Sequence, residues 1–127
     1  MSTTEAESLE ACEKLFAAIP RGDLAAVRAL YAPNAAIWHN HDGVTQDPDA
    51  NLRVLDWVVH NLRDISYQVT RRQATPTGFV QQHVMRGVAP SGKKLELAAC
   101  IICDVSGGRI TRLDEYLDSA QLAALAP

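Results

Sequence analysis

The chain has 127 residues, the length of one ordinary domain, and its 47% of hydrophobic residues can form a core without disulfides or a metal. A net charge of −3 gives no reason to expect a nucleic-acid-binding protein, whose surface carries a basic patch, and no apolar run approaches the ~20 residues that span a bilayer. Because the acidic start is unlike a signal peptide and three cysteines make no even disulfide framework, we expect one domain over 1–127, located in the cytoplasm.

Helical periodicity dominates the first part of the chain. Thr4, followed by Glu7 three positions later, has the pattern of a capping box and predicts that a helix begins there. This helix is expected to end at Pro20, and a shorter helix is predicted over 23–30. The apolar stripe of the first helix is expected to consist of Leu9, Cys12, Phe16 and Ile19.

A short strand over 35–40 and a third helix are predicted next. Asp47 and Pro48 are typical of the N-cap and the first helical position, so the third helix should begin there and continue to about residue 62. Its buried stripe is expected to consist of Leu52, Leu55, Val59 and Leu62.

The second half of the chain predicts a sheet. Strand-like runs bounded by Gly, Pro and Ser turns occupy 65–72, 78–88, 95–105 and 109–117, and a short helix is predicted over 118–125. Helices followed by an antiparallel meander indicate an α+β fold with the helices on one face of a curved sheet.

Three segments of the chain resemble the SnoaL-like, ketosteroid-isomerase-like superfamily, which has the nuclear transport factor 2-like fold. They are 16–24 with 30–35, the triplet Trp38-His39-Asn40, and 108–118. The motifs are most similar to limonene-epoxide-hydrolase-like and polyketide-cyclase-like members. The resemblance covers nearly the whole chain and implies a cone-shaped α+β barrel, with three N-terminal helices packed on a strongly curved, mixed, mainly antiparallel sheet. It says less about the reaction, since this fold supports many chemistries and also binding proteins.

Alternation along the strands selects the residues expected to face a pocket. On the last strand the more apolar face carries Thr111, Leu113, Glu115 and Leu117, so Glu115 should lie among leucines. The pattern does not separate the two faces of 78–88. There the resemblance to epoxide hydrolases favours the face that carries Phe79, Gln81, His83 and Met85 as the inward one.

His83 and Glu115 are the expected catalytic pair. Histidine titrates near neutral pH, and a carboxylate bonded to one ring nitrogen would orient the other toward a substrate. On the first strand either Trp38 and Asn40 or His39 should enter the pocket, since period two makes these alternatives exclusive unless a bulge intervenes. His39 and Asn40 are therefore further catalytic candidates.

The substrate-binding residues expected around this pair are mostly apolar. They are Phe16, Trp38, Leu55, Val59, Gln81, Met85, Leu97, Leu113 and Leu117. His39 and His41 would share a face of a strand and could bind a metal, but His41 begins a loop and the family resembled mostly works without metal, so we expect none here. We expect no cofactor.

The sequence departs from the family at residues that carry its known reactions. Leu15 stands where ketosteroid isomerases have a tyrosine, and Gln81, His83 and Glu115 stand where epoxide hydrolases have an Arg–Asp–Asp set. The expected function is therefore cofactor-free acid/base chemistry on a small, mostly apolar molecule, by an isomerase, dehydratase, cyclase or retro-aldol-type lyase. The alternatives are an epoxide hydrolase with an altered polar set and a non-catalytic binding or interaction module. Apolar residues on both faces of 95–105 favour a homodimer through the sheet.

Overall fold

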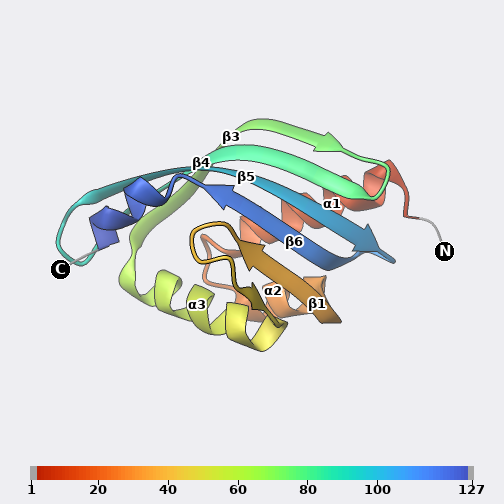
Figure 1. The fold of residues 1–127 in the computed structure, drawn as a ribbon, viewed down its shortest axis with the longest axis horizontal. Helices are drawn as coiled ribbons and strands as arrows, with labels where there is room; N and C mark the ends of the chain where they lie inside the picture. The colour runs from red at the N-terminus through yellow and green to blue at the C-terminus, as the bar shows by residue number, and fades with distance from the viewer. Residues whose placement is uncertain (1–2, 126–127) are drawn as a thin grey trace.

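The computed structural model describes residues 3–125 (Figure 1). The helices and strands follow one another in the predicted order, with one short additional strand. They are α1 (Glu5–Ala18), α2 (Leu24–Leu30), β1 (Tyr31–His39), β2 (Thr45–Gln46), α3 (Pro48–Asn61), β3 (Arg63–Ala74), β4 (Gly78–Val88), β5 (Lys94–Ser106), β6 (Arg109–Leu117) and the 3₁₀-helix η1 (Ser119–Leu125).

Side-chain caps begin the three helices where the sequence predicts. The hydroxyl of Thr4 accepts a hydrogen bond from the backbone N–H of Glu7 at 3.1 Å, and the Glu7 carboxylate accepts one from the Thr4 N–H at 3.3 Å. Asp23 caps α2 and Asp47 caps α3, with the Pro48 ring at the first helical position. Each cap satisfies an N–H group that has no partner inside its helix.

The six strands form one mixed sheet in the order β2-β1-β6-β5-β4-β3. All neighbours pair antiparallel except β1 and β6, which are parallel and bring residues far apart in the sequence side by side. In that register His39 lies opposite Glu115. The predicted fold class is confirmed: helices pack on a curved, mixed, mainly antiparallel sheet (Figure 1).

The inward faces of β4 and β6 largely follow the predicted alternation. Gln81, His83 and Met85 are buried on β4, and Leu113 is buried on β6. One expected inward residue differs: Thr111 is half-buried and Ile110 is fully buried in its place. The reason is a bulge in the β5–β6 pairing, which shifts the register next to Asp104 and reverses the alternation at the start of β6.

A close backbone approach explains the glycine that opens β4. A Cβ atom on Gly78 would lie 1.9 Å from the carbonyl oxygen of Cys103 on the neighbouring strand. Only a residue without a side chain lets the two strands approach this closely.

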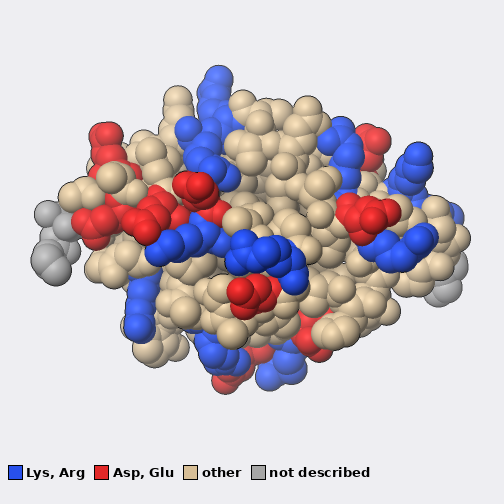
Figure 2. All heavy atoms as spheres, turned by 180° about the vertical axis from the view of Figure 1, so that it is seen from behind, with Lys and Arg blue, Asp and Glu red and all other residues tan. Residues whose placement is uncertain are grey.

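The core lies between the helices and the concave face of the sheet. Its larger part joins α1, α2 and the inward residues of the sheet, and a smaller cluster around Leu62, Met85, Leu95 and Leu97 lies toward η1. None of the helices in the described part of the chain is long and apolar enough to cross a membrane. Basic and acidic side chains are interspersed on the face shown in Figure 2, which presents no surface of one sign.

Candidate active site

Two neighbouring cavities that share several lining residues lie between α3 and the sheet. The outer cavity has a volume of about 330 Å³ and is walled mainly by apolar side chains from α3, the sheet and η1. The inner cavity, of about 60 Å³, lies deeper, toward α1. The residues that line both cavities are His39, Asn51, Leu55, Tyr67 and Glu115. Polar groups therefore gather where an apolar chamber meets the core.

His39 and Glu115 form a hydrogen-bonded pair at this junction. The Nε2 atom of His39 lies 3.0 Å from Oε1 of Glu115, and the two side chains are only 14% and 17% exposed. The pair follows from topology, since the parallel register of β1 and β6 places the two residues opposite each other on the same face. A carboxylate only accepts hydrogen bonds, so Nε2 carries the proton. The other ring nitrogen, Nδ1, has no hydrogen-bond partner among residues 3–125 and is left to act as an acceptor.

His83 is held in a different set of contacts from the one we expected. Its Nδ1 atom lies 2.9 Å from Nε2 of Gln81, whose oxygen accepts hydrogen bonds from Arg72 Nε at 2.7 Å and from the Cys12 thiol at 3.2 Å. Within residues 3–125, Glu115 bonds to His39 and not to His83. The physical reason is lateral strand order, because β5 separates β4 from β6 whereas β1 lies directly beside β6.

The same contacts define the protonation of His83. Arginine only donates hydrogen bonds, so the Gln81 oxygen faces Arg72 and the Gln81 amide N–H faces the histidine. Nδ1 of His83 must then accept, which places the ring proton on Nε2. Burial lowers the pKa of His83, opposed by the Glu115 carboxylate and helped by Arg72, and favours the neutral ring.

Trp38 and Asn40 do not enter either cavity, contrary to the first of the two alternatives for β1. Trp38 packs on the outer face of the sheet, with its ring 5.2 Å from that of Tyr116. The Asn40 side chain donates to the carbonyl of Leu117 and accepts from its N–H, which prolongs the β1–β6 pairing by one residue. His39 lies two residues after the fully buried Ile37, so alternation along β1 places it on the inward face.

The other expected lining residues divide into three groups. Leu55, Met85, Leu97 and Leu117 line the outer cavity. Phe16 and Leu113 line the inner cavity, which Leu55 also reaches. Gln81 and Val59 line neither: Gln81 lies in the network around His83, and Val59 lies against the turn at Gly22, 3.9 Å from where a Cβ of that glycine would be.

Three polar residues of the site were absent from the sequence-based set. Tyr31 donates a hydrogen bond from its hydroxyl to Oδ1 of Asn51 at 2.8 Å, and Tyr67 lines both cavities from β3. Alternation with Ile65 could have placed Tyr67 inward, but nothing in the sequence distinguishes Asn51 from any other polar residue of an amphipathic helix. Burial raises the pKa of both tyrosines well above its ordinary value, so both keep their protons.

The described residues provide no cluster of three or more histidine, cysteine or acidic side chains suited to a metal ion. His41 lies at the mouth of the outer cavity, where its ring is 5.8 Å from that of His39. Its own partner is Asp42, at 3.6 Å between Nε2 and Oδ2.

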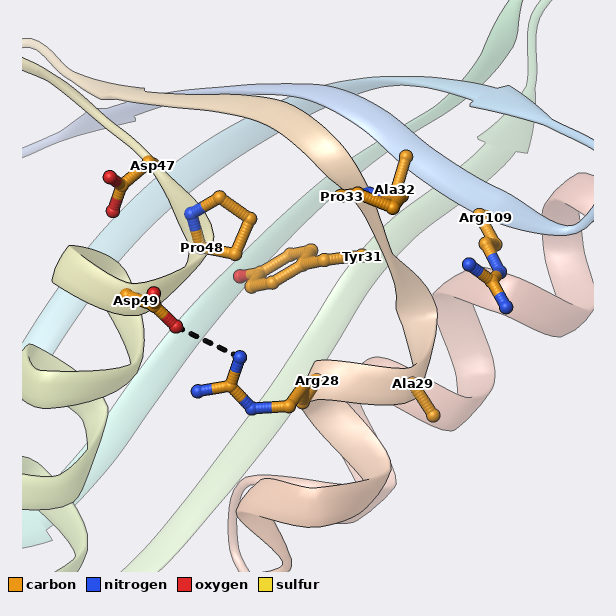
Figure 3. Close-up of a pocket in the computed structure, with 9 residues that line it drawn as sticks. All are labelled: Arg28, Ala29, Tyr31, Ala32, Pro33, Asp47, Pro48, Asp49 and Arg109. Carbon is orange, nitrogen blue, oxygen red and sulfur yellow. Dashed lines mark hydrogen bonds and ion pairs between the residues drawn. The ribbon is translucent and has the colours of Figure 1, made fainter.

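A separate surface hollow of about 420 Å³ lies between α2, β1 and the start of α3 (Figure 3). Two of its charged residues pair with each other, since Arg28 contacts Asp49 at 2.9 Å. Tyr31 extends from β1 toward α3 and separates this hollow from the inner cavity, to which it also contributes (Figure 3). The lining of this hollow contains no histidine, so we place the candidate site in the two neighbouring cavities between α3 and the sheet.

Comparison with known proteins agrees with this architecture. The sequence profile of the SnoaL-like domain family matches residues 12–113. No curated protein sequence matches the chain.

Several solved structures share the fold. An NTF2-like protein of unknown function from Burkholderia pseudomallei has a TM-score of 0.82 at 17% identity, covering 95% of this chain and 98% of that one. IdmH from Streptomyces antibioticus, a proposed polyketide cyclase, has a TM-score of 0.81 at 22% identity, with coverage of 93% and 96%. An LEH-like epoxide hydrolase from M. tuberculosis has a TM-score of 0.78 at 16% identity, with coverage of 94% and 88%.

At these low sequence identities the structural neighbours establish only the fold of this chain. The family profile covers most of the chain, from α1 to the inward leucine of β6. The chain belongs to the SnoaL-like domain family.

Proposed function

We propose that this protein is a cofactor-free acid/base enzyme acting on a small, mostly apolar organic molecule. The observation that carries the proposal is the His39–Glu115 pair, 3.0 Å apart at the inner end of an apolar cavity. The base is thereby assigned to His39 instead of His83, whose Nδ1 is occupied by Gln81 and which lines neither cavity.

The proposed chemistry begins with transfer of a proton from a substrate C–H bond to Nδ1 of His39. Glu115 accepts the hydrogen bond from Nε2 and stabilises the imidazolium that forms. Return of the proton at another carbon would complete an isomerisation, and loss of a leaving group would complete an elimination. Apolar walls suit a carbon-rich substrate and exclude water that would weaken these contacts.

The experiment uses 5-nitrobenzisoxazole, a small apolar probe for a base in an apolar cavity. When a base takes its ring C–H proton, the N–O bond breaks with the electron pair going to oxygen, and a coloured nitrile-phenolate forms. Wild-type protein should accelerate this reaction, and His39→Gln should lower the rate by about 10²-fold or more. Glu115→Gln should give a smaller loss, since an amide oxygen still accepts from Nε2 but carries no charge.

A matched control is available on α3. His60 forms another histidine–carboxylate pair, with Asp56 at 3.3 Å, but its side chain is 71% exposed and lies outside both cavities. His60→Gln should leave the rate unchanged. Equal rates for wild type and His39→Gln would contradict the assignment of the base, and saturable binding of the probe without turnover would favour the non-catalytic binding module.

The inner cavity supports a second candidate, an epoxide hydrolase with an altered polar set. Its volume of about 60 Å³ is large enough for water, and Tyr67 and Glu115 offer a donor and an acceptor. Hydrolysis of styrene oxide that is lost in Glu115→Gln would favour this candidate over proton transfer between carbon atoms.

We also propose that two copies pair through the outer face of the sheet. Ile102 is 44% exposed and Tyr116 50% exposed on adjacent strands of that face, beside Trp38. Apolar side chains gathered on an open sheet face favour a symmetric partner.

A further inference from the structure

The apolar wall of the outer cavity continues onto the surface of the protein along α3. Val54 and Trp57 line this cavity, yet each of them is 45% exposed. They stand three positions apart on α3, so they are neighbours on one face of the helix. We call this pair the α3 lip. Single exposed apolar side chains are common, whereas adjacent ones at the rim of an apolar cavity are typical of a binding surface.

The ring of Trp57 has no aromatic partner in the described part of the chain. The other tryptophan, Trp38, packs against the ring of Tyr116 at 5.2 Å. The remaining contacts between rings within residues 3–125 join Phe16, Tyr67 and the histidines. Trp57 therefore keeps apolar ring surface that a ligand can cover, and an indole gives more binding area than most side chains.

On α3, polar and apolar residues of the cavity wall are separated. Asn51 lines the inner end, where its Oδ1 atom accepts a hydrogen bond from the Tyr31 hydroxyl at 2.8 Å. Leu55 follows one turn later and also lines both cavities. Val58 and the α3 lip line only the outer cavity. Beyond Asn51, α3 therefore provides an apolar path from the inner end of the cavity to solvent.

The polar groups of the cavity mouth lie on a different segment. His41 and Asp42 come from the turn after β1 and contact each other at 3.6 Å. The hydrogen-bonded pair of His39 and Glu115 lies at the inner end. A molecule with one polar group can therefore place it at this pair while its apolar part follows α3 outward.

The size of the outer cavity limits what it can enclose. Its volume of about 330 Å³ lies near the lower end of the ~300–1,000 Å³ typical of small-molecule pockets. A ligand that fills this space and is longer than the cavity must leave it through the mouth. Its outer part then meets either the polar turn or the α3 lip, and an apolar chain is stabilised only by the lip.

We propose that the α3 lip is a specificity-determining site for elongated substrates, which place a polar end at His39 and an apolar tail across Val54 and Trp57. This inference rests on the proposed function and narrows its substrates to molecules with an apolar part longer than the cavity. Trp57 takes no part in the chemistry. It selects the substrate by covering the tail that the cavity cannot enclose.

The test uses linear alcohols from butan-1-ol to decan-1-ol, whose hydroxyl can donate a hydrogen bond to Nδ1 of His39. Calorimetric titration measures the affinity of each alcohol. Wild-type affinity should rise by up to about fourfold for each added CH₂ group, including the longest chains. Trp57→Ala should weaken binding of decan-1-ol by about tenfold and leave that of butan-1-ol unchanged, since only a long chain reaches the lip.

Fluorescence reports the same contact independently. The chain has two tryptophans, so Trp38→Phe leaves Trp57 as the only one. Decan-1-ol should shift the emission of Trp57 to shorter wavelength as the ring loses contact with water, and butan-1-ol should not.

Two variants are controls. Trp57→Phe keeps an aromatic ring and should recover most of the affinity for decan-1-ol. Arg53→Ala shortens an exposed side chain of the same helix that lines neither cavity, and it should bind every alcohol like wild type. A melting curve for each variant establishes that it is folded.

The outcomes separate this inference from the proposed function. A loss in Trp57→Ala that grows with chain length supports the inference. An equal loss for all alcohols, or none, overturns it, and so does a Trp57 emission that shifts with protein concentration instead of alcohol, which would indicate a second copy on the lip. Turnover of 5-nitrobenzisoxazole that depends on His39 would still support the proposed base in each of these cases. Wild-type protein that neither binds an alcohol nor turns over this probe overturns both.

Discussion

Replacing Gln81 with leucine removes the amide at the centre of the buried network between α1, β3 and β4. Gln81 is 0% exposed, and its three partners are Arg72 at 2.7 Å, His83 at 2.9 Å and the Cys12 thiol at 3.2 Å. Leucine has a similar volume, so the main cost is the loss of these hydrogen bonds. His83 Nδ1 would be left buried without a donor, whereas the half-buried Arg72 can turn to water.

The magnitude follows from these contacts. A hydrogen bond to a charged group contributes about 1.5–3 kcal/mol and a neutral one about 0.5–1.5 kcal/mol, and the thiol bond adds little. We expect Gln81→Leu to lower the free energy of unfolding by about 2–4 kcal/mol. Urea unfolding followed by circular dichroism measures this difference directly.

The neighbouring glutamine provides the control. Gln82 is exposed on the opposite face of β4, and Gln82→Leu should change stability by less than about 0.5 kcal/mol. If Gln81→Leu unfolds at the same urea concentration as Gln82→Leu, with the same slope, the network adds no stability. The reasoning from buried polar contacts would then be refuted.

Three further predictions follow from the described geometry. Burial lowers the pKa of His83, so below about pH 6.5 the unfolded chain takes up a proton before the native protein does. The free energy of unfolding should then decrease by up to about 1.4 kcal/mol for each pH unit below this value. Urea unfolding at several pH values should show a weaker pH dependence for His83→Gln than for wild type. Gly78→Ala should destabilise the protein by about 1–3 kcal/mol in thermal unfolding, since its Cβ would overlap the Cys103 carbonyl. Gly92→Ala is the control: its Cβ would meet nothing within 4 Å, so its loss of stability should come only from the backbone strain of an alanine at a φ of +88°. Ile102→Asp should convert a dimer to single chains in sedimentation velocity, and a wild-type protein that sediments as single chains at micromolar concentration would contradict the proposed pairing.

Local patterns predicted most of the fold. The strands 78–88 and 109–117 have the predicted bounds because glycine-containing turns precede both. The start of β1 at Tyr31 was missed, since it follows α2 without an intervening turn and includes Pro33, which is rare inside strands. The bulge that buries Ile110 was also missed, because no local signal marks a register shift set by a neighbouring strand.

The site was harder to predict than the fold. Alternation predicted that Glu115 faces inward, and the family resemblance predicted the same for His83, but neither signal tells which inward residues are neighbours. That depends on lateral strand order, which puts β1 and not β4 beside β6. The sequence also did not determine which alternate residues of β1 face inward, since Trp38, His39 and Asn40 are large or polar side chains in succession. Only the pairing with β6 turns His39 inward.

The parallel pairing of β1 with β6 also has a consequence for how the protein folds. The two residues of the candidate dyad lie on strands that are neighbours in the sheet but far apart in the sequence, so the pair cannot form until β6, the last strand, has been synthesised. During synthesis β1 cannot pair with β6 until that strand has been made, whereas the strands β3 to β6 can pair one after another as local hairpins. Closure of this long loop would then be a late and slow event, and acid/base capability would arise only once the chain has completed its fold.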